Sequence, residues 1–325
     1  MKRPLLPVHG GPDGGPVIPH DFSTNASPLG PPPALRQAVT QADRQRYPDP
    51  HYRALRALLG CEQRVLPTAG GAEGIRRLTL AAMLTGRREV WVPQPGFGDY
   101  GLAAQALGLA VRPYAEPADI QPTAPALVWV CEPCNPTGRS VPHWPALGDA
   151  LVVVDRAYEP LRLHGGTPAL PPGAWQLVCP NKALGLTGIR AGYLVAPDTD
   201  EVWAQALSLA PSWVLAAEGV ALLTHWPTEA TQAWLANART TLHGWVASQR
   251  ELLADLGWEQ QPSVTPFWLA RPPRGGLTAR LRAHGIALRD ASSFGLPGWV
   301  RVSAQPPASQ QALAQALHDI QGVDT

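Results

Sequence analysis

Lysine is nearly missing from this chain. Lys2 and Lys182 are its two lysines, so all but two of the 26 basic residues are arginines. Arginine replaces lysine in many exposed positions, but its guanidinium stays protonated and cannot act as an amine nucleophile. Lys182 is therefore a candidate for chemistry that needs an amine. The alternative is that it survived by chance.

Other features are scarce as well. Charged residues make up 16% of the chain, and 25 acidic residues nearly balance the basic ones, so we expect no nucleic-acid partner and no binding to a membrane surface. The longest apolar runs, such as 126–131 and 150–154, are too short to span a bilayer. The N-terminus lacks the apolar stretch of a signal peptide, and we therefore predict a cytoplasmic protein.

Four cysteines are present, and Cys131 and Cys134 form a C-x-x-C pair. A zinc site needs a second pair of ligands, and no further C-x-x-C or H-x3-5-H pattern follows. We predict no metal site and interpret the cysteines as ordinary thiols of a reducing compartment.

The order of apolar runs and helical patterns indicates the fold class. Between 51 and 213, buried strands are expected at 90–92, 126–131, 151–154, 177–179 and 192–195, with helices over 51–60, 72–85, 99–108, 143–149 and 200–209. This alternation predicts an α/β protein with a mostly parallel sheet that is covered on both faces. Residues 1–50 are rich in proline and glycine and show little helical periodicity.

The C-terminal part has a different pattern. A long helical pattern runs from 214 to 256, and it is followed by strands at 267–270, 286–288 and 299–302 and by helices at 276–284 and 307–320. We expect a smaller α+β unit here, packed on the first.

Small and polar residues follow the expected strands, where ligands of α/β sheets bind. Gly70-Gly71-Ala72 begins a helix whose N–H groups could hold a phosphate. Phe97 could stack on an aromatic ring, and Asn135 lies in an Asn-Pro-Thr-Gly segment. Each of these features has an ordinary alternative: the glycines could form a plain turn, Phe97 could be a core residue, and the Asn135 segment could be a bare turn.

Charged residues continue this series. Asp155 ends a buried strand, which is costly unless its carboxylate meets a cation such as a protonated pyridine nitrogen. Lys182 follows the strand at 177–179, and Arg190 lies eight residues later, where its guanidinium could bind a phosphate with two hydrogen bonds. For Asp155, a helix cap or a local salt bridge is the alternative.

The joint order of these residues resembles the fold-type-I enzymes that depend on pyridoxal 5′-phosphate (PLP), the aminotransferase superfamily, over nearly the whole chain. The resemblance implies an aspartate aminotransferase-like fold. Its large PLP-binding domain would span 46–213, and the small domain would combine 1–45, including an N-terminal arm, with 214–325.

The resemblance also implies residue roles. Lys182 would bind PLP as a Schiff base, and Asp155 would keep the ring nitrogen protonated. The other implied cofactor contacts are Asn135 and Tyr158 to the ring oxygen, Phe97 on the ring, and Gly71, Ala72, Asn181 and Arg190 at the phosphate. Tyr47, in Arg46-Tyr-Pro-Asp49, would reach the phosphate of a neighbouring subunit, which implies a homodimer. Two segments depart from the family pattern: Asp155-Arg-Ala-Tyr158 has Arg for the usual Glu, and Cys179-Pro-Asn181 lacks the Ser or Thr that often binds phosphate.

Two groups of the superfamily are similar in their substrate segments: histidinol-phosphate aminotransferases, and the threonine-phosphate decarboxylases of cobalamin biosynthesis. In both, Arg301 would bind a substrate carboxylate and Arg289 a phosphate, although one of the two could make a surface salt bridge instead. The segments His9-Gly-Gly11 and Asp21-Phe-Ser-Thr-Asn25 are similar to the cobalamin group and imply substrate contacts by His9 and Asn25.

We therefore favour a PLP-dependent carboxy-lyase that acts on O-phospho-L-threonine, with histidinol-phosphate aminotransferase, using glutamate and 2-oxoglutarate, as the alternative. A regulator built on the same fold would need an N-terminal helix-turn-helix, and the prolines and glycines of 1–50 argue against one. An inactive scaffold would have no need to keep Lys182 together with Asp155.

Overall fold

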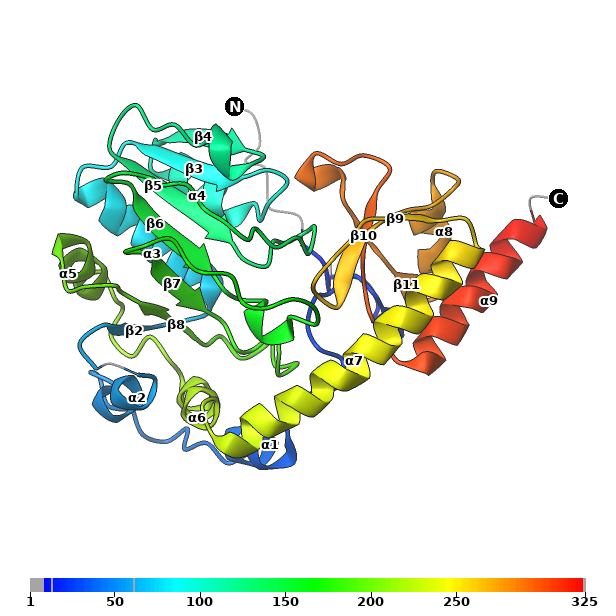
Figure 1. The fold of residues 1–325 in the computed structure, drawn as a ribbon. Helices are drawn as coiled ribbons and strands as arrows, with labels where there is room; N and C mark the ends of the chain where they lie inside the picture. The colour runs from blue at the N-terminus through cyan, green and yellow to red at the C-terminus, as the bar shows by residue number, and fades with distance from the viewer. Residues whose placement is uncertain (1–8, 13, 61, 324–325) are drawn as a thin grey trace.

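A computed structural model describes residues 9–12, 14–60 and 62–323, so Lys2 and Cys61 lie outside the described residues. Its main layer is a seven-stranded sheet (Figure 1). In spatial order the strands are β2 (Val65–Thr68), β8 (Gly192–Val195), β7 (Trp175–Val178), β6 (Leu151–Asp155), β5 (Ala126–Cys131), β3 (Glu89–Pro93) and β4 (Ala110–Tyr114). Strand β8 runs antiparallel to both neighbours, and the other pairs are parallel, which confirms the mostly parallel sheet.

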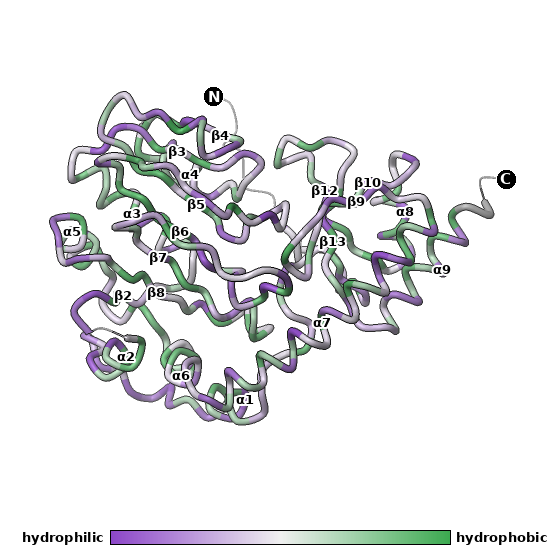
Figure 2. Tube along the Cα trace, in the orientation of Figure 1, coloured by the Kyte–Doolittle hydropathy of each residue, from purple (hydrophilic) through white to green (hydrophobic). Residues whose placement is uncertain are grey.

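Both faces of this sheet are covered, as its uninterrupted apolar strands predict. Every residue of β5 and β6 is buried, and these strands form the hydrophobic centre of the larger lobe in Figure 2. Helices α3 (Gly71–Leu84), α4 (Asp99–Ala106) and α5 (Glu201–Ser208) pack together beside the sheet. Helices α1 (Pro33–Thr40), α2 (Arg53–Leu58) and α6 (Ala217–His225) form a second group.

The helix expected over 143–149 is wrong. This segment has no helical hydrogen bonding, yet Trp144 and Leu147 still pack against the valines of β5 and β6. Pro142 and Pro145 each remove a backbone donor, and Gly148 has a left-handed φ of 57°. The apolar pattern therefore reports burial of these side chains rather than a helix.

The long helical pattern of 214–256 is two helices. Helix α6 ends at His225, and α7 (Glu229–Asp255) begins after Pro227. Thr228 caps α7, because its hydroxyl accepts a hydrogen bond from the N–H of Thr231. Helix α7 then runs from beside α1 and α6 to the smaller unit (Figure 1).

The smaller unit has its own core. Its antiparallel sheet has the order β12 (Arg289–Asp290), β13 (Val300–Ser303), β10 (Phe267–Arg271) and β9 (Glu259–Gln260). Helices α8 (Leu277–Ala283) and α9 (Pro307–Val323) cover it, and Phe22 packs into this core from the N-terminal segment. Of the predicted strand at 286–288, residues 286 and 287 form β11 (Ile286–Ala287), and residue 288 lies between β11 and β12. Strand β11 pairs with β1 (His20–Asp21). The exact domain boundaries at 45/46 and 213/214 stay a prediction.

Elements α1, β2 and β4 were not expected from the sequence. Helix α1 begins at the third of three consecutive prolines, and β2 and β4 each contain one proline, so the local signal was weak. Among the described residues, no helix is both long and apolar enough to cross a membrane.

Candidate active site

The carboxyl ends of the parallel strands open into one cavity of about 720 Å³. This is the edge at which α/β sheets bind ligands. The cavity brings together most of the residues that the sequence singled out: His9, Asn25, Ala72, Phe97, Asn135, Tyr158, Asn181, Lys182, Arg190, Arg289 and Arg301. Gly71 lies next to Ala72 at the start of α3, Asp155 lies at the end of β6, and Tyr47 lies elsewhere.

Lys182 and Asp155 form the electrostatic centre of the cavity. The Lys182 Nζ atom lies 5.3 Å from the centre of the Tyr158 ring. Asp155 is buried, and both of its carboxylate oxygens have donors: Tyr100 Oη donates to Oδ2 at 2.7 Å, and the N–H of Ala157 donates to Oδ1 at 2.9 Å. These two hydrogen bonds fix the plane of the carboxylate.

The environment changes the protonation of both groups. Burial raises the pKa of Asp155, and Lys182, Tyr100 and the N–H of Ala157 oppose that rise. Burial lowers the pKa of Lys182, but the neighbouring Tyr158, Cys179 and Asp155 outweigh burial, so that this pKa lies above its usual value. A buried acid and an amine that influence each other at the end of two adjacent strands are typical of a catalytic site.

The N-terminus of α3 lies next to Arg190. Gly70 precedes the helix with a φ of 81°, and a Cβ atom there would lie 2.7 Å from Arg190 Nη2. Arg190 is exposed, and its Nη1 atom donates to the carbonyl of Thr187. The first N–H groups of a helix bind phosphate well, and the nearby guanidinium adds a positive charge. Asn181 donates to the carbonyl of Ile189, while its buried Oδ1 atom has no donor among the described residues.

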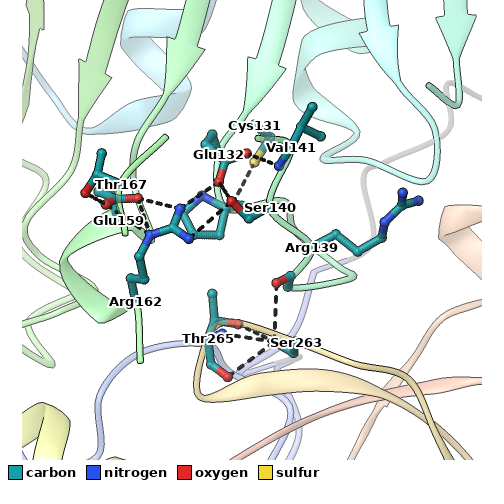
Figure 3. Close-up of polar contacts among 12 residues, drawn as sticks. Cys131, Glu132, Arg139, Ser140, Val141, Glu159, Arg162, Thr167, Ser263 and Thr265 are labelled. Atoms are coloured by element: carbon teal, nitrogen blue, oxygen red, sulfur yellow. Dashed lines mark hydrogen bonds and ion pairs between the residues drawn. The ribbon is translucent and has the colours of Figure 1, made fainter. Parts of the chain in front are cut away.

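The loop that carries Asn135 is held by a buried ionic network (Figure 3). Glu132 is 2% exposed and accepts hydrogen bonds from Ser140 Oγ at 2.5 Å, from the N–H of Val141 at 2.8 Å and from Arg162 Nη2 at 2.6 Å. Arg162 also pairs with Glu159 at 2.9 Å. On the other side of the loop, a Cβ atom on Gly138 would collide with Ser263. The loop is therefore fixed between the two lobes.

Two buried arginines approach the cavity from the smaller unit. Arg301 donates from Nη1 to Asn135 Oδ1 at 2.5 Å and from Nη2 to the carbonyl of Ser23 at 2.6 Å. Its Nε atom has no acceptor among the described residues, and burial lowers the pKa of Arg301 to about 10. Arg289 donates to Ser293 Oγ at 2.6 Å. Arg301 makes no salt bridge with an acid among the residues that the structure describes.

The N-terminal segment closes over Arg301. A Cβ atom on Gly10 would lie 2.2 Å from the carbonyl oxygen of Ser23 and 3.1 Å from Arg301 Nη2, so this position has no room for a side chain. The N–H of Gly11 donates to Ser23 Oγ at 2.8 Å. Asn25 donates to Asn135 Oδ1 at 3.2 Å, and the N–H of Ser27 donates to the carbonyl of Lys182 at 2.8 Å. The segment thus connects Arg301, Asn135 and Lys182.

Tyr47 does not reach this cavity. Its side chain is 78% exposed and stacks on Trp213, with the ring centres 4.4 Å apart. Its predicted contact with a neighbouring subunit stays a prediction. Among residues that the sequence did not single out, Tyr100 contacts Asp155, and Asp99 and Ser293 line the cavity. The sequence shows an aromatic residue at position 100, in Pro95-Gly-Phe-Gly-Asp-Tyr100, but it does not show that Tyr100 contacts Asp155, 55 residues away.

Cys131, Cys134 and Cys179 are free thiols. Within the described residues there is no group of three or more His, Cys, Asp or Glu side chains that could hold a metal ion. Burial raises the pKa of Cys179 to about 12, so this thiol stays protonated.

Comparison with known proteins agrees with this arrangement. The model of the family described as aminotransferase class I and II matches residues 18–320. Histidinol-phosphate aminotransferase 2 of Caulobacter vibrioides is 30% identical over 325 aligned residues, which cover 91% of this chain and 85% of that protein.

Two solved structures share the fold. The L-threonine-O-3-phosphate decarboxylase of Porphyromonas gingivalis has a TM-score of 0.77 at 22% identity and covers 93% of this chain and 99% of its own. The histidinol-phosphate aminotransferase of Sinorhizobium meliloti, solved in complex with pyridoxal-5′-phosphate, has a TM-score of 0.75 at 23% identity and covers 91% of this chain and 90% of its own.

Proposed function

Because the chain belongs to the aminotransferase class I and II family, we propose that it is an aminotransferase of phosphorylated amines, with histidinol phosphate as amino donor and 2-oxoglutarate as acceptor. Pyridoxal 5′-phosphate is the cofactor. The observation that carries the proposal is the pair of buried arginines, Arg289 and Arg301, in the same cavity as Lys182. Such a cavity suits substrates that carry a phosphate or a carboxylate besides their amine.

The residues of the cavity fit the cofactor. The α3 N-terminus and Arg190 would hold its phosphate, where Gly70 leaves space for the Arg190 guanidinium. Asp155 would face the ring nitrogen, and Phe97 would stack on the ring. When bound, the cofactor supplies a ring that withdraws electrons from the substrate Cα.

The chain's own groups would then handle substrate and proton. Arg289 would bind the phosphate of histidinol phosphate, and Arg301 would bind a carboxylate of 2-oxoglutarate or glutamate. The Lys182 amine would take the proton from the substrate Cα. The N-terminal segment over Arg301 would exclude water from the carboxylate site, which strengthens that ion pair.

The sequence favoured the decarboxylase, and the relatives favour the aminotransferase. A histidinol-phosphate aminotransferase is 30% identical to this chain, whereas the decarboxylase of similar structure, at 22% identity, supports the fold alone. One observation keeps the decarboxylase as a second candidate. The His9-Gly10-Gly11 segment, which resembles that group, lines the cavity beside Arg301.

Parallel assays separate the two candidates. The purified holoenzyme is incubated with L-histidinol phosphate and 2-oxoglutarate, and glutamate is measured. It is also incubated with O-phospho-L-threonine, and CO2 is measured. We expect glutamate formation, and we expect Lys182→Arg, which keeps the charge but not the nucleophile, to abolish it together with the visible absorbance of the lysine-linked cofactor. Release of CO2 without any glutamate would establish the decarboxylase instead.

Two further proposals concern the whole protein. The exposed Tyr47–Trp213 stack supports a homodimer, because exposed aromatic pairs are typical of protein interfaces. We also propose that the enzyme works in the cytoplasm.

A further inference from the structure

The cavity extends beyond the residues that the proposed function uses. One wall of this outer part is helix α4, which contributes Asp99, Leu102 and Gln105. The N-terminal segment also lines the cavity, with His9 and Pro12. Residues 99, 102 and 105 are three apart, which places them along one face of the helix. The face of α4 toward the cavity therefore offers an acid, an apolar side chain and an amide.

Asp99 is unusual within this cavity. It is the one carboxylate among the described lining residues, while Lys182, Arg190, Arg289 and Arg301 are basic. Asp99 is 7% exposed, and no described residue donates a hydrogen bond to it. The imidazole of His9 lies near it, with Nε2 3.9 Å from Asp99 Oδ1. That distance is beyond a hydrogen bond.

Asp99 lines the cavity, and its carboxylate oxygens are not among the fully buried atoms, so a ligand in the cavity that supplies an N–H group could gain a hydrogen bond to it. Asp99 is the first residue of α4, so its carboxylate lies at the N-terminal end of that helix. Leu102 adds an apolar surface next to it, which suits a flat ring. An imidazole has both properties, whereas the methyl group of threonine phosphate has no donor.

We propose that Asp99, Leu102 and Gln105 form a subsite that binds the imidazole ring of the substrate through an N–H···O hydrogen bond to Asp99. This inference deepens the proposed function and rests on it for the identity of the substrate. The arginines bind the anionic end of the molecule, and Asp99 binds the ring, so the cavity selects phosphorylated amines that carry a donor-bearing ring.

The test uses two probes that lack an amine and cannot react: 3-(imidazol-4-yl)propyl phosphate and 3-phenylpropyl phosphate. Their dissociation constants for the holoenzyme are measured by calorimetry. We expect the imidazole probe to bind about tenfold or more tightly than the phenyl probe, as one hydrogen bond to a charged acceptor gives. Asp99→Asn should remove most of this preference and leave the affinity for the phenyl probe unchanged. The exposed Asp149→Asn is the matched control and should keep the preference.

Two results would overturn the subsite. One is equal affinity of the wild-type holoenzyme for both probes. The other is an equal loss of affinity for both probes in Asp99→Asn, because Asp99 would then act through His9 on the phosphate. The proposed function fails separately: if the imidazole probe binds through Asp99 but histidinol phosphate gives no glutamate, the subsite stands and the aminotransferase assignment is wrong.

Discussion

At the scale of single residues, a hydroxyl group is one of the groups that set the pKa of a buried acid. Burial raises the pKa of Asp155, and the hydrogen bond from Tyr100 opposes that rise. As the pH falls through its raised pKa, Asp155 gains a proton and loses the charge that would hold the protonated ring nitrogen of the cofactor. Affinity for PLP should therefore fall on the acid side of the pH range.

Tyr100→Phe removes that hydrogen bond, so the pKa of Asp155 should rise further. We expect the acid limb of PLP affinity to move to higher pH and the dissociation constant near neutral pH to increase about tenfold or more, as for a hydrogen bond to a charged group. Spectrophotometric PLP titrations across the pH range measure both. Tyr114→Phe is the matched control, because Tyr114 is also buried but donates to a neutral carbonyl, that of Trp129, at 2.7 Å. If the acid limb of PLP affinity moved equally in Tyr100→Phe and Tyr114→Phe, this result would contradict the role of Tyr100.

At the scale of elements, the first turn of α3 depends on Gly70. An alanine there would have a left-handed φ of 81° and a Cβ atom 2.7 Å from Arg190 Nη2. Gly70→Ala should cost about 1 kcal/mol of unfolding free energy from the backbone alone, and it should also displace Arg190 and weaken PLP binding.

Gly86→Ala separates the two effects. Gly86 has a φ of 92°, but a Cβ atom there would meet no atom within 4 Å. The two variants should lose similar thermal stability, measured by calorimetry of the cofactor-free protein, while Gly70→Ala alone should lose affinity for PLP. Equal PLP affinities in both variants would mean that Arg190 does not hold the phosphate.

At the scale of the whole molecule, the proposed homodimer would complete each site with Tyr47 of the partner subunit. Inactive Lys182→Ala protein is mixed and refolded with Tyr47→Ala protein. Mixed dimers would contain one site with an intact lysine from one subunit and an intact tyrosine from the other. We expect about a quarter of the wild-type activity to return. Light scattering checks that dimers form. In the control mixture, Tyr47→Ala is replaced by Leu84→Ala, which also removes an exposed apolar side chain. Activity no greater than that of the separate variants would contradict a shared site.

The fold was largely predictable because its strands are short, continuous apolar runs. The runs at 126–131 and 151–154 match β5 and β6 because both faces of a parallel sheet are buried, so each strand needs apolar side chains on both sides. The segment 143–149 was mispredicted because Trp144 and Leu147 are buried by a chain that proline keeps out of a helix. Apolar periodicity reports which side chains are covered, and it does not report backbone hydrogen bonds.

By itself, the sequence determined the cofactor chemistry that this chain can support. Lys182 is kept in an arginine-rich chain, and Asp155 and Arg190 stand in a fixed order with it after successive strands. This order can be read from local sequence, and it places the residues together because the strand ends of a parallel sheet meet at one edge. The tertiary structure alone decided which side chains meet. Tyr100 contacts Asp155, Gly10 packs against Arg301, and Asp99 lies buried in the cavity without a donor. These contacts join residues far apart in the chain, and their energies depend on burial, which only the folded molecule defines.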